Sequence, residues 1–221
     1  MKYSDITKLK HLAQDKISRS ANPAVVRNST VFFKNIQELT KQENLVKKGS
    51  KVDFYEYGRA GSQTTIALQN FISDLEGAHR TFLTSTGFGA VALAILSICR
   101  PKDEIIVTDA VYAPTRMITS KLLKEFNVKT HFYNPENLQS LQTKINKKTK
   151  MIFVENPGSN TFEFQDLSKI IKIAKKRNII TAIDNTWGTP FFIKPLKIGF
   201  DMSISSGTKY LSGHSDVMLG S

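Results

Sequence analysis

The fold class is set by residues 151–184, MIFVENPGSNTFEFQDLSKIIKIAKKRNIITAID, which combine two hydrophobic patterns. Met151–Glu155 and Ile179–Ile183 are short apolar runs typical of buried strands, and Asp166–Arg177 between them has apolar residues at helical spacing. A strand–helix–strand unit of this length implies a right-handed crossover between parallel strands. The stretch therefore predicts a parallel sheet covered by helices.

The same alternation continues on both sides of this stretch. Further predicted strands are His79–Leu83, Glu104–Thr108, Lys129–Phe132 and Met202–Ser205. Further predicted helices are Thr64–Leu75, Gly87–Ile98, Pro114–Phe126 and Glu136–Lys144. Gly77 suits a C-terminal cap for the first of these helices. The class is α/β, a mostly parallel sheet covered by helices.

The first part of the chain has a different pattern. Asp5–Ile17 predicts an amphipathic helix, whereas Leu39–Ala60 has no clear period and is expected to be extended. Long loops of this kind often bind a ligand or reach a partner. We therefore expect an N-terminal helix and arm over residues 1–62 and an α/β domain over residues 63–221.

Composition excludes several classes of protein. Hydrophobic residues make up 40% of the chain and charged residues 23%, which is too apolar for wholesale disorder. No run approaches the roughly 18 apolar residues of a membrane-spanning helix, and the start of the sequence has no apolar core of a secretory signal. The single cysteine, Cys99, cannot form an intramolecular disulfide. We expect a cytoplasmic protein without a membrane partner.

The chain is basic, with 31 Lys and Arg against 19 Asp and Glu and a formal charge of +12. The lysines are scattered, and those of Lys172–Arg177 fall where a helix ends and cations favour the helix dipole. No nucleic-acid-binding motif accompanies them, so we expect a solvated surface and no nucleic-acid partner. The four histidines share no metal-ligand spacing, and we expect no metal site.

Several polar groups follow predicted strands, where ligands of parallel sheets bind. Ser85–Gly89 is either a plain strand–helix connection or a turn whose N–H groups bind a phosphate. Asp184 is either a cap or a buried anion with a cationic partner. Lys209 is either a surface lysine or, together with Asp184, part of a pyridoxal phosphate site. That cofactor needs a nucleophilic lysine and a carboxylate at its pyridinium nitrogen.

Two further segments allow a structural and a functional reading. Tyr112 is either a core aromatic residue or a ring that stacks on a flat cofactor. Tyr57-Gly-Arg59 is either exposed charge in an aperiodic segment or a phosphate contact through the guanidinium group.

Two segments together identify a family resemblance. Ala182-Ile-Asp-Asn-Thr-Trp-Gly188 and Ser205-Ser-Gly-Thr-Lys-Tyr-Leu-Ser-Gly-His-Ser-Asp216 resemble the signature of the Cys/Met-metabolism (trans-sulfuration) pyridoxal phosphate enzymes of fold type I. The resemblance extends to Glu155–Ser159, Tyr112, Ser85–Gly89, Tyr57–Arg59 and Asn22–Thr30. Within the family the chain is most similar to the cystathionine β-lyase branch, on the evidence of Tyr57–Ser62, Val111–Arg116 and Trp187.

The resemblance implies roles for the matched residues. Lys209 would bind the cofactor covalently and act as the catalytic base, Asp184 would pair with the ring nitrogen, and Tyr112 would stack on the ring. The phosphate ligands would be the amides of Gly87 and Phe88 and the hydroxyls of Ser206 and Thr208. Tyr57 and Arg59 would reach the cofactor of a neighbouring subunit in a homo-oligomer, a dimer of dimers, and Tyr57 and Tyr112 would also serve catalysis.

The implied reaction is β-elimination of L-cystathionine and related cysteine S-conjugates to homocysteine, pyruvate and ammonia in methionine metabolism. The alternatives are a γ-synthase or γ-lyase of the same family, and a truncated, non-catalytic remnant. Family members continue well beyond the position of Ser221 into a smaller C-terminal domain. We expect that domain to be absent from this chain.

Overall fold

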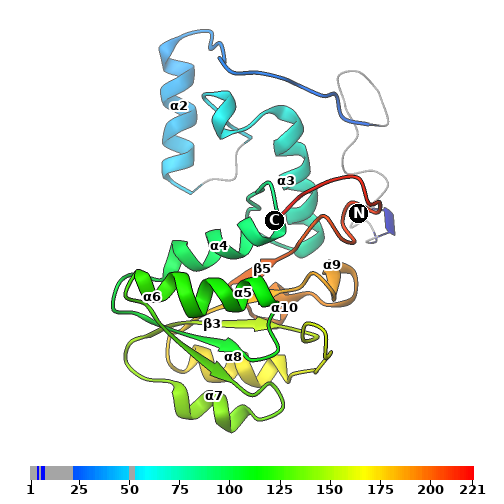
Figure 1. Cartoon of the computed structure of the whole chain (residues 1–221). Coiled ribbons are helices and arrows are strands. Elements are labelled where there is room, and N and C mark those ends of the chain that lie inside the picture. The colour runs from blue at the N-terminus through cyan, green and yellow to red at the C-terminus, as the bar shows by residue number, and fades with distance from the viewer. Residues whose placement is uncertain (1–3, 5, 8–21, 50–52) are drawn as a thin grey trace. The chain divides into compact units, whose positions relative to one another are not determined.

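The computed structural model describes residues 4, 6–7, 22–49 and 53–221 (Figure 1). The chain folds as two compact units, Met1–Phe82 and Leu83–Ser221. The predicted helix Asp5–Ile17 lies almost wholly outside the described residues. The expected division into an N-terminal arm, residues 1–62, and an α/β domain, residues 63–221, stays a prediction. It rests on contacts of the arm with another subunit.

The first unit contains a helix that the sequence pattern did not predict. Helix α2 spans Ile36–Lys47, where we expected extended chain from Leu39 onward. Asn35 begins it, since its side chain accepts the N–H of Glu38 at 2.9 Å. None of the residues of α2 is buried. The pattern therefore had no apolar stripe to detect, because it is burial that imposes helical periodicity.

The rest of the first unit is built from a short 3-10 turn, Gly58–Ala60, and helix α3, Gln63–Glu76. Ser62 and Thr65 form a capping box at the start of α3. Gly77 ends the helix in the left-handed region with φ 71°, which confirms the predicted cap. Both ends of α3 are therefore fixed by local sequence.

The second unit contains the predicted sheet. Its strands are β1 Glu104–Thr108, β2 Lys129–Tyr133, β3 Thr149–Glu155, β4 Ile180–Asp184 and β5 Met202–Ile204. All neighbours are parallel, in the order β2-β1-β3-β4-β5 (Figure 1). The α/β class and these five predicted strands are confirmed. The predicted strand His79–Leu83 is wrong: within the described residues only Thr84 pairs here, in a single antiparallel bridge with Gly220.

Helices connect the strands. Those that the pattern predicted are α4 Gly87–Ile98, α5 Ala113–Met117 with α6 Leu123–Glu125, α7 Leu138–Lys144 and α8 Leu167–Lys175. Two short helices between β4 and β5, α9 Thr189–Phe192 and α10 Pro195–Ile198, were not predicted. A π-helical turn, Ile118–Leu122, joins α5 to α6, so the single predicted helix Pro114–Phe126 is present with a widened middle turn. In the described part of the chain, every helix is too short or too polar to cross a bilayer.

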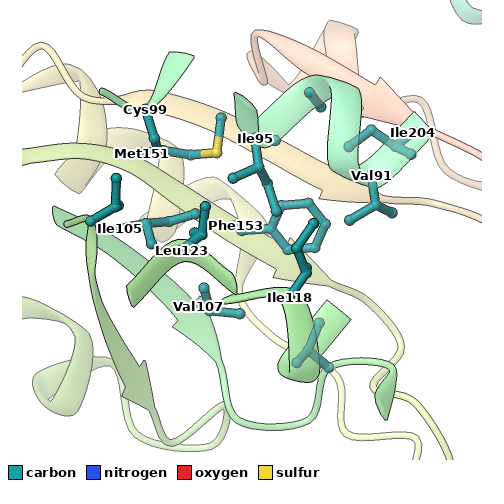
Figure 2. Packing of buried hydrophobic residues seen from close by; sticks show 14 of the residues in the cluster. Val91, Ile95, Cys99, Ile105, Val107, Ile118, Leu123, Met151, Phe153 and Ile204 are labelled. Carbon is teal, nitrogen blue, oxygen red and sulfur yellow. The ribbon is translucent and has the colours of Figure 1, made fainter. Parts of the chain in front are cut away.

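Two apolar layers cover the two faces of the sheet. Ile105 and Val107 pack under α4 and the α5–α6 segment together with Phe153, which is fully buried (Figure 2). Ile106, between them in β1, faces the opposite layer with α7 and α8. Successive strand residues point to opposite faces, so a strand that is buried throughout its length needs helices on both sides.

The strand order also locates a crevice. The chain leaves β1 to form β2 on one side and then returns to form β3 on the other side of β1. At such a switch point the loops that follow the two strands diverge, and ligands bind outside their carboxyl ends. Those ends carry Thr108 and Glu155 in this sheet.

Candidate active site

The N-terminus of α4 forms a tight cradle. The Thr86 side chain accepts the N–H of Gly89 at 2.9 Å, which leaves the N–H groups of Gly87 and Phe88 without an acceptor among the described residues. A Cβ atom at Gly87 would lie 2.4 Å from Oγ and Cβ of Ser206. The structure therefore brings together Gly87 and Ser206, two of the predicted phosphate ligands, and only a glycine fits between them.

A chain of hydrogen bonds joins this cradle to Asp184. The backbone N–H of Ser206 donates to Thr186 Oγ1 at 2.8 Å, and the backbone N–H of Thr186 donates to Asp184 Oδ1 at 3.0 Å. Asp184 is the last residue of β4 and is buried. Burial raises the pKa of its carboxyl group, and the Thr186 hydrogen bonds oppose that rise. A cation beside Asp184 would remove this cost of burial.

A second carboxyl group, that of Glu155, belongs to the same site. Glu155 ends β3, and its Cα is the register partner of Asp184 in β4. Its Oε2 accepts the backbone N–H of Tyr112 at 2.7 Å. Burial and then the Asp184 charge raise the pKa of Glu155 to about 8, against the hydrogen bonds from Tyr112 and Ser159. Two carboxyl groups this close cannot both ionise cheaply.

A pocket of about 720 Å³ lies at these strand ends. Lys209 and Glu155 both line it, as do Thr186 and Asp216. Lys209 follows β5 and is exposed. An exposed amine keeps its access to a ligand that enters the pocket.

Aromatic side chains form one wall of this pocket. Trp187 and Tyr210 both line it, with ring centroids 5.5 Å apart. The ring centroids of Phe162 and Trp187 lie 5.8 Å apart. Phe162 has φ 61°, a backbone conformation that is rare for a bulky residue and is typical of constrained loops near sites.

Thr208 is placed differently from Ser206. Its hydroxyl donates to the carbonyl of Leu219 at 3.2 Å and accepts the Leu219 N–H at 3.0 Å. The hydroxyl therefore ties the strand exit to the segment after it. A phosphate would have to compete with the Leu219 carbonyl for the hydroxyl hydrogen of Thr208.

Most of the predicted site residues of the second unit meet at one edge of the sheet. Thr186 links Asp184 to Ser206, Ser206 lies against Gly87, and the backbone N–H of Lys209 donates to the carbonyl of Ser206 at 3.0 Å. Tyr112 joins them through Glu155. These neighbours come from five different segments of the chain, as expected for a site at a switch point.

Tyr57 and Arg59 lie in the first unit. Tyr57 precedes the 3-10 turn and bridges Thr30. The guanidinium carbon of Arg59 lies 5.8 Å from the centroid of the Tyr57 ring. Gly58 between them donates its N–H to Ser29 at 2.7 Å, and a Cβ atom there would lie 2.1 Å from the carbonyl oxygen of Asn28. The turn thus presents Tyr57 and Arg59 as one paired group.

Sequence reasoning missed two residues of the site, Glu155 and Thr186. Glu155 belongs to the segment Glu155–Ser159 that resembles the family, and a charged residue that ends an otherwise buried strand is itself a signal. Thr186 gave no such signal. Its role depends on the approach of the segment after β4 to the segment after β5.

Comparison with known proteins agrees with this arrangement. The sequence profile of the Cys/Met metabolism PLP-dependent enzymes matches residues 7–221. A Saccharomyces cerevisiae relative is 38% identical, over 93% of this chain and 58% of its own. Cystathionine beta-lyase of Haemophilus influenzae is 36% identical over 91% of this chain and 50% of its own length. The chain thus spans about half of the length of these relatives.

Solved structures show the same likeness. A Campylobacter jejuni structure that contains N'-pyridoxyl-lysine-5'-monophosphate matches with a TM-score of 0.89 and 27% identity, over 99% of this chain and 53% of that one. Cystathionine gamma-lyase of Lactobacillus plantarum, complexed with L-serine, matches with a TM-score of 0.88 and 27% identity, over 99% of this chain and 54% of that one. The chain therefore belongs to the Cys/Met-metabolism family of pyridoxal phosphate-dependent enzymes.

Proposed function

We propose that this chain is the cofactor-binding part of a carbon–sulfur lyase that acts on L-cystathionine and related cysteine S-conjugates. With water, cystathionine would give homocysteine, pyruvate and ammonia, a step of methionine metabolism. The observation that carries the proposal is the hydrogen-bonded series from Asp184 through Thr186 to Ser206, next to Gly87 and the pocket that Lys209 lines. The likeness to the beta-lyase of H. influenzae supports the choice of reaction.

The residues of the site fit pyridoxal phosphate. The cradle at Gly87 offers two backbone N–H groups at the positive end of a twelve-residue helix, which suits a phosphate dianion. The Ser206 hydroxyl adds a further donor beside it, and Asp184 is a buried carboxyl group whose charged form a cation would stabilise. Gly87, Phe88, Ser206 and Thr208 would hold the phosphate, and Tyr112 would stack on the ring.

Each proposed catalytic residue has a task that its position allows. When bound, pyridoxal phosphate supplies an electrophilic carbon for the substrate amine and a ring that accepts electrons from the substrate Cα. The amine of Lys209, released from its own bond to the cofactor, would take the Cα proton as a general base. The same Nζ then holds a proton that the leaving sulfur can receive. Asp184 would keep the ring nitrogen protonated, and Tyr112 with Tyr57 would orient the reacting groups.

We infer that the site is completed by a second copy of the chain. Tyr57 and Arg59 would then reach the phosphate bound by the neighbouring subunit, in a homo-oligomer built as a dimer of dimers. Arg59→Ala and Lys209→Ala chains each lack one half of such a site. Mixing the two unfolded chains and refolding them together should restore tight cofactor binding in part of the sites. If the mixture binds no better than the separate variants, the shared site is refuted.

We also infer a reducing compartment, the cytoplasm. Cys99 is a buried free thiol at the end of α4. Burial raises its pKa to about 11, which keeps the group protonated and unreactive. A protein targeted to an oxidising compartment would more often use its cysteines in disulfides. Cell fractionation of the tagged chain tests this inference.

A γ-lyase or γ-synthase is the second candidate. Cystathionine gamma-lyase of Bacillus subtilis is 33% identical over 75% of this chain and 44% of its own length. Product analysis separates the candidates, because β-elimination of cystathionine releases pyruvate and γ-elimination releases 2-oxobutyrate. A third candidate, a non-catalytic remnant, predicts cofactor bound at Lys209 and no keto acid.

The test of the proposal uses purified chain with added pyridoxal phosphate, followed by borohydride reduction and peptide mapping. We expect the label on Lys209, no label at that position in Lys209→Ala, and unchanged labelling in Lys169→Ala, a variant of an exposed lysine on α8. Cystathionine should then yield pyruvate. Label spread over surface lysines would refute the cofactor site, and 2-oxobutyrate as the product would refute β-elimination.

A further inference from the structure

The proposed function gives no role to Glu155, although Glu155 contacts Tyr112 and pairs with Asp184, which both have one. It lines the pocket with Lys209, pairs in register with Asp184 and binds the backbone of Tyr112. Its own main chain is held in turn, since the Gln165 side chain donates to the Glu155 carbonyl at 2.9 Å. Because the main chain of Glu155 is held in place, its carboxyl group can in turn fix the position of a residue that it contacts.

The Tyr112 amide is the neighbour that most needs an anchor. Tyr112 precedes α5, has no side-chain cap of its own, and its side chain is about half exposed. The Oε2 of Glu155 accepts its N–H at 2.7 Å from a strand on the other side of the switch point. Without this acceptor the Tyr112 N–H would lose a short bond that fixes the start of the helix.

We propose that Glu155 is a positioning residue, whose carboxyl oxygen fixes the backbone of Tyr112 so that the tyrosine ring covers the cofactor site. The proposal rests on the proposed function, because it assumes that Tyr112 stacks on the cofactor. It requires an acceptor oxygen at this position and no negative charge. The raised pKa of Glu155 agrees with that requirement, since a protonated carboxyl keeps its carbonyl acceptor.

Two variants of Glu155 separate the acceptor from the side chain's bulk. Glu155→Gln keeps an acceptor oxygen of the same reach, whereas Glu155→Leu keeps much of the volume and loses the acceptor. Glu104→Leu is the matched control. Glu104 is a buried carboxylate at the amino end of β1, whereas the site lies at the carboxyl ends of the strands, and its side chain contacts Asn146 and His131. The substitution weakens the same sheet away from the site.

The first measurement is amide hydrogen exchange at Tyr112 in the chain without added cofactor. We expect protection to fall about tenfold in Glu155→Leu relative to the β-sheet amides, and to persist in Glu155→Gln and Glu104→Leu. Unchanged protection in Glu155→Leu would overturn the proposal. So would an equal loss in Glu155→Gln, because the acceptor would then not be what matters.

The second measurement is the affinity for pyridoxal phosphate, with the circular dichroism of the bound cofactor as a record of its orientation. We expect about tenfold weaker binding and an altered spectrum in Glu155→Leu, with wild-type values in Glu155→Gln. Lost amide protection with an unchanged spectrum and affinity would overturn the positioning role. If the unmodified chain takes up no cofactor, the proposed function fails instead, and the exchange result alone then decides the Glu155–Tyr112 contact.

Discussion

Gly87→Ala is the substitution whose effect follows most directly from the geometry. The new Cβ atom would lie 2.4 Å from Cβ and Oγ of Ser206 and 2.8 Å from its Cα. Ordinary contacts between such atoms begin near 3.5 Å, so the two backbones must separate by most of an ångström. Overpacking of this kind costs roughly 1–3 kcal/mol. The better helix propensity of alanine returns at most about 1 kcal/mol.

We therefore expect Gly87→Ala to lower the free energy of unfolding by roughly 1–2 kcal/mol. Cofactor affinity should fall at least about tenfold, since the donors of the cradle move apart. Urea unfolding of the chain without cofactor and a spectroscopic titration with pyridoxal phosphate measure the two effects separately.

Gly89→Ala is the control on the same helix. Its Cβ atom would meet only side-chain atoms, the nearest being Thr86 Oγ1 at 3.1 Å. We expect it to be neutral or up to about 1 kcal/mol more stable, with unchanged cofactor affinity. If Gly87→Ala behaves like Gly89→Ala in both assays, the close approach of α4 to Ser206 does not exist and the cradle is refuted.

Three more substitutions test the core, a helix end and the carboxyl pair. Phe153→Ala empties a fully buried site and should cost roughly 3–5 kcal/mol in urea unfolding, whereas a cost below about 1 kcal/mol would contradict the packing in Figure 2. Arg100→Ala removes three hydrogen bonds to carbonyls at the end of α4, those of Leu96, Ser97 and the capping residue Cys99, and should lower the urea midpoint by the equivalent of about 1 kcal/mol, with no change in cofactor affinity. Because the pKa of Glu155 is raised from 4.5 to about 8, the folded chain holds more protons than the unfolded chain between these values. The free energy of unfolding without cofactor should then fall as pH rises through that window, by at most about 1.4 kcal/mol per pH unit, and Glu155→Gln should flatten this slope.

Much of the fold could be predicted because local sequence and burial agreed. Helix α4 was predicted with the bounds that the structure shows, since Thr86 caps its start and an apolar run fills it. Strand β1 is buried along its whole length, which leaves an unbroken apolar run between turns. The same reasoning failed for α2, which buries nothing, and for residues 79–83, which do not form the predicted strand.

The site could be predicted as far as strand ends identify it. Asp184 and Lys209 stood out because each follows a predicted strand and carries a charge. Glu155 is also a charged residue at the end of a predicted strand. The sequence alone, however, does not indicate that β3 and β4 are neighbours in the sheet, which brings Glu155 beside Asp184. The hydroxyl of Thr208 is a similar case, because its bonds to Leu219 depend on how the chain turns back after the strand.

Strand order is the step that turns separate motifs into one site. Glu155 and Asp184 end β3 and β4, whereas Tyr112 and Ser206 follow β1 and β5, and in the chain these residues are separated by helices and loops. Because β1, β3, β4 and β5 are consecutive neighbours and all parallel, their carboxyl ends meet at one edge. Adjacent strands lie about 4.8 Å apart, so groups at those ends reach each other directly or through one side chain. The bonds from Tyr112 to Glu155 and from Ser206 through Thr186 to Asp184 are what this spacing allows.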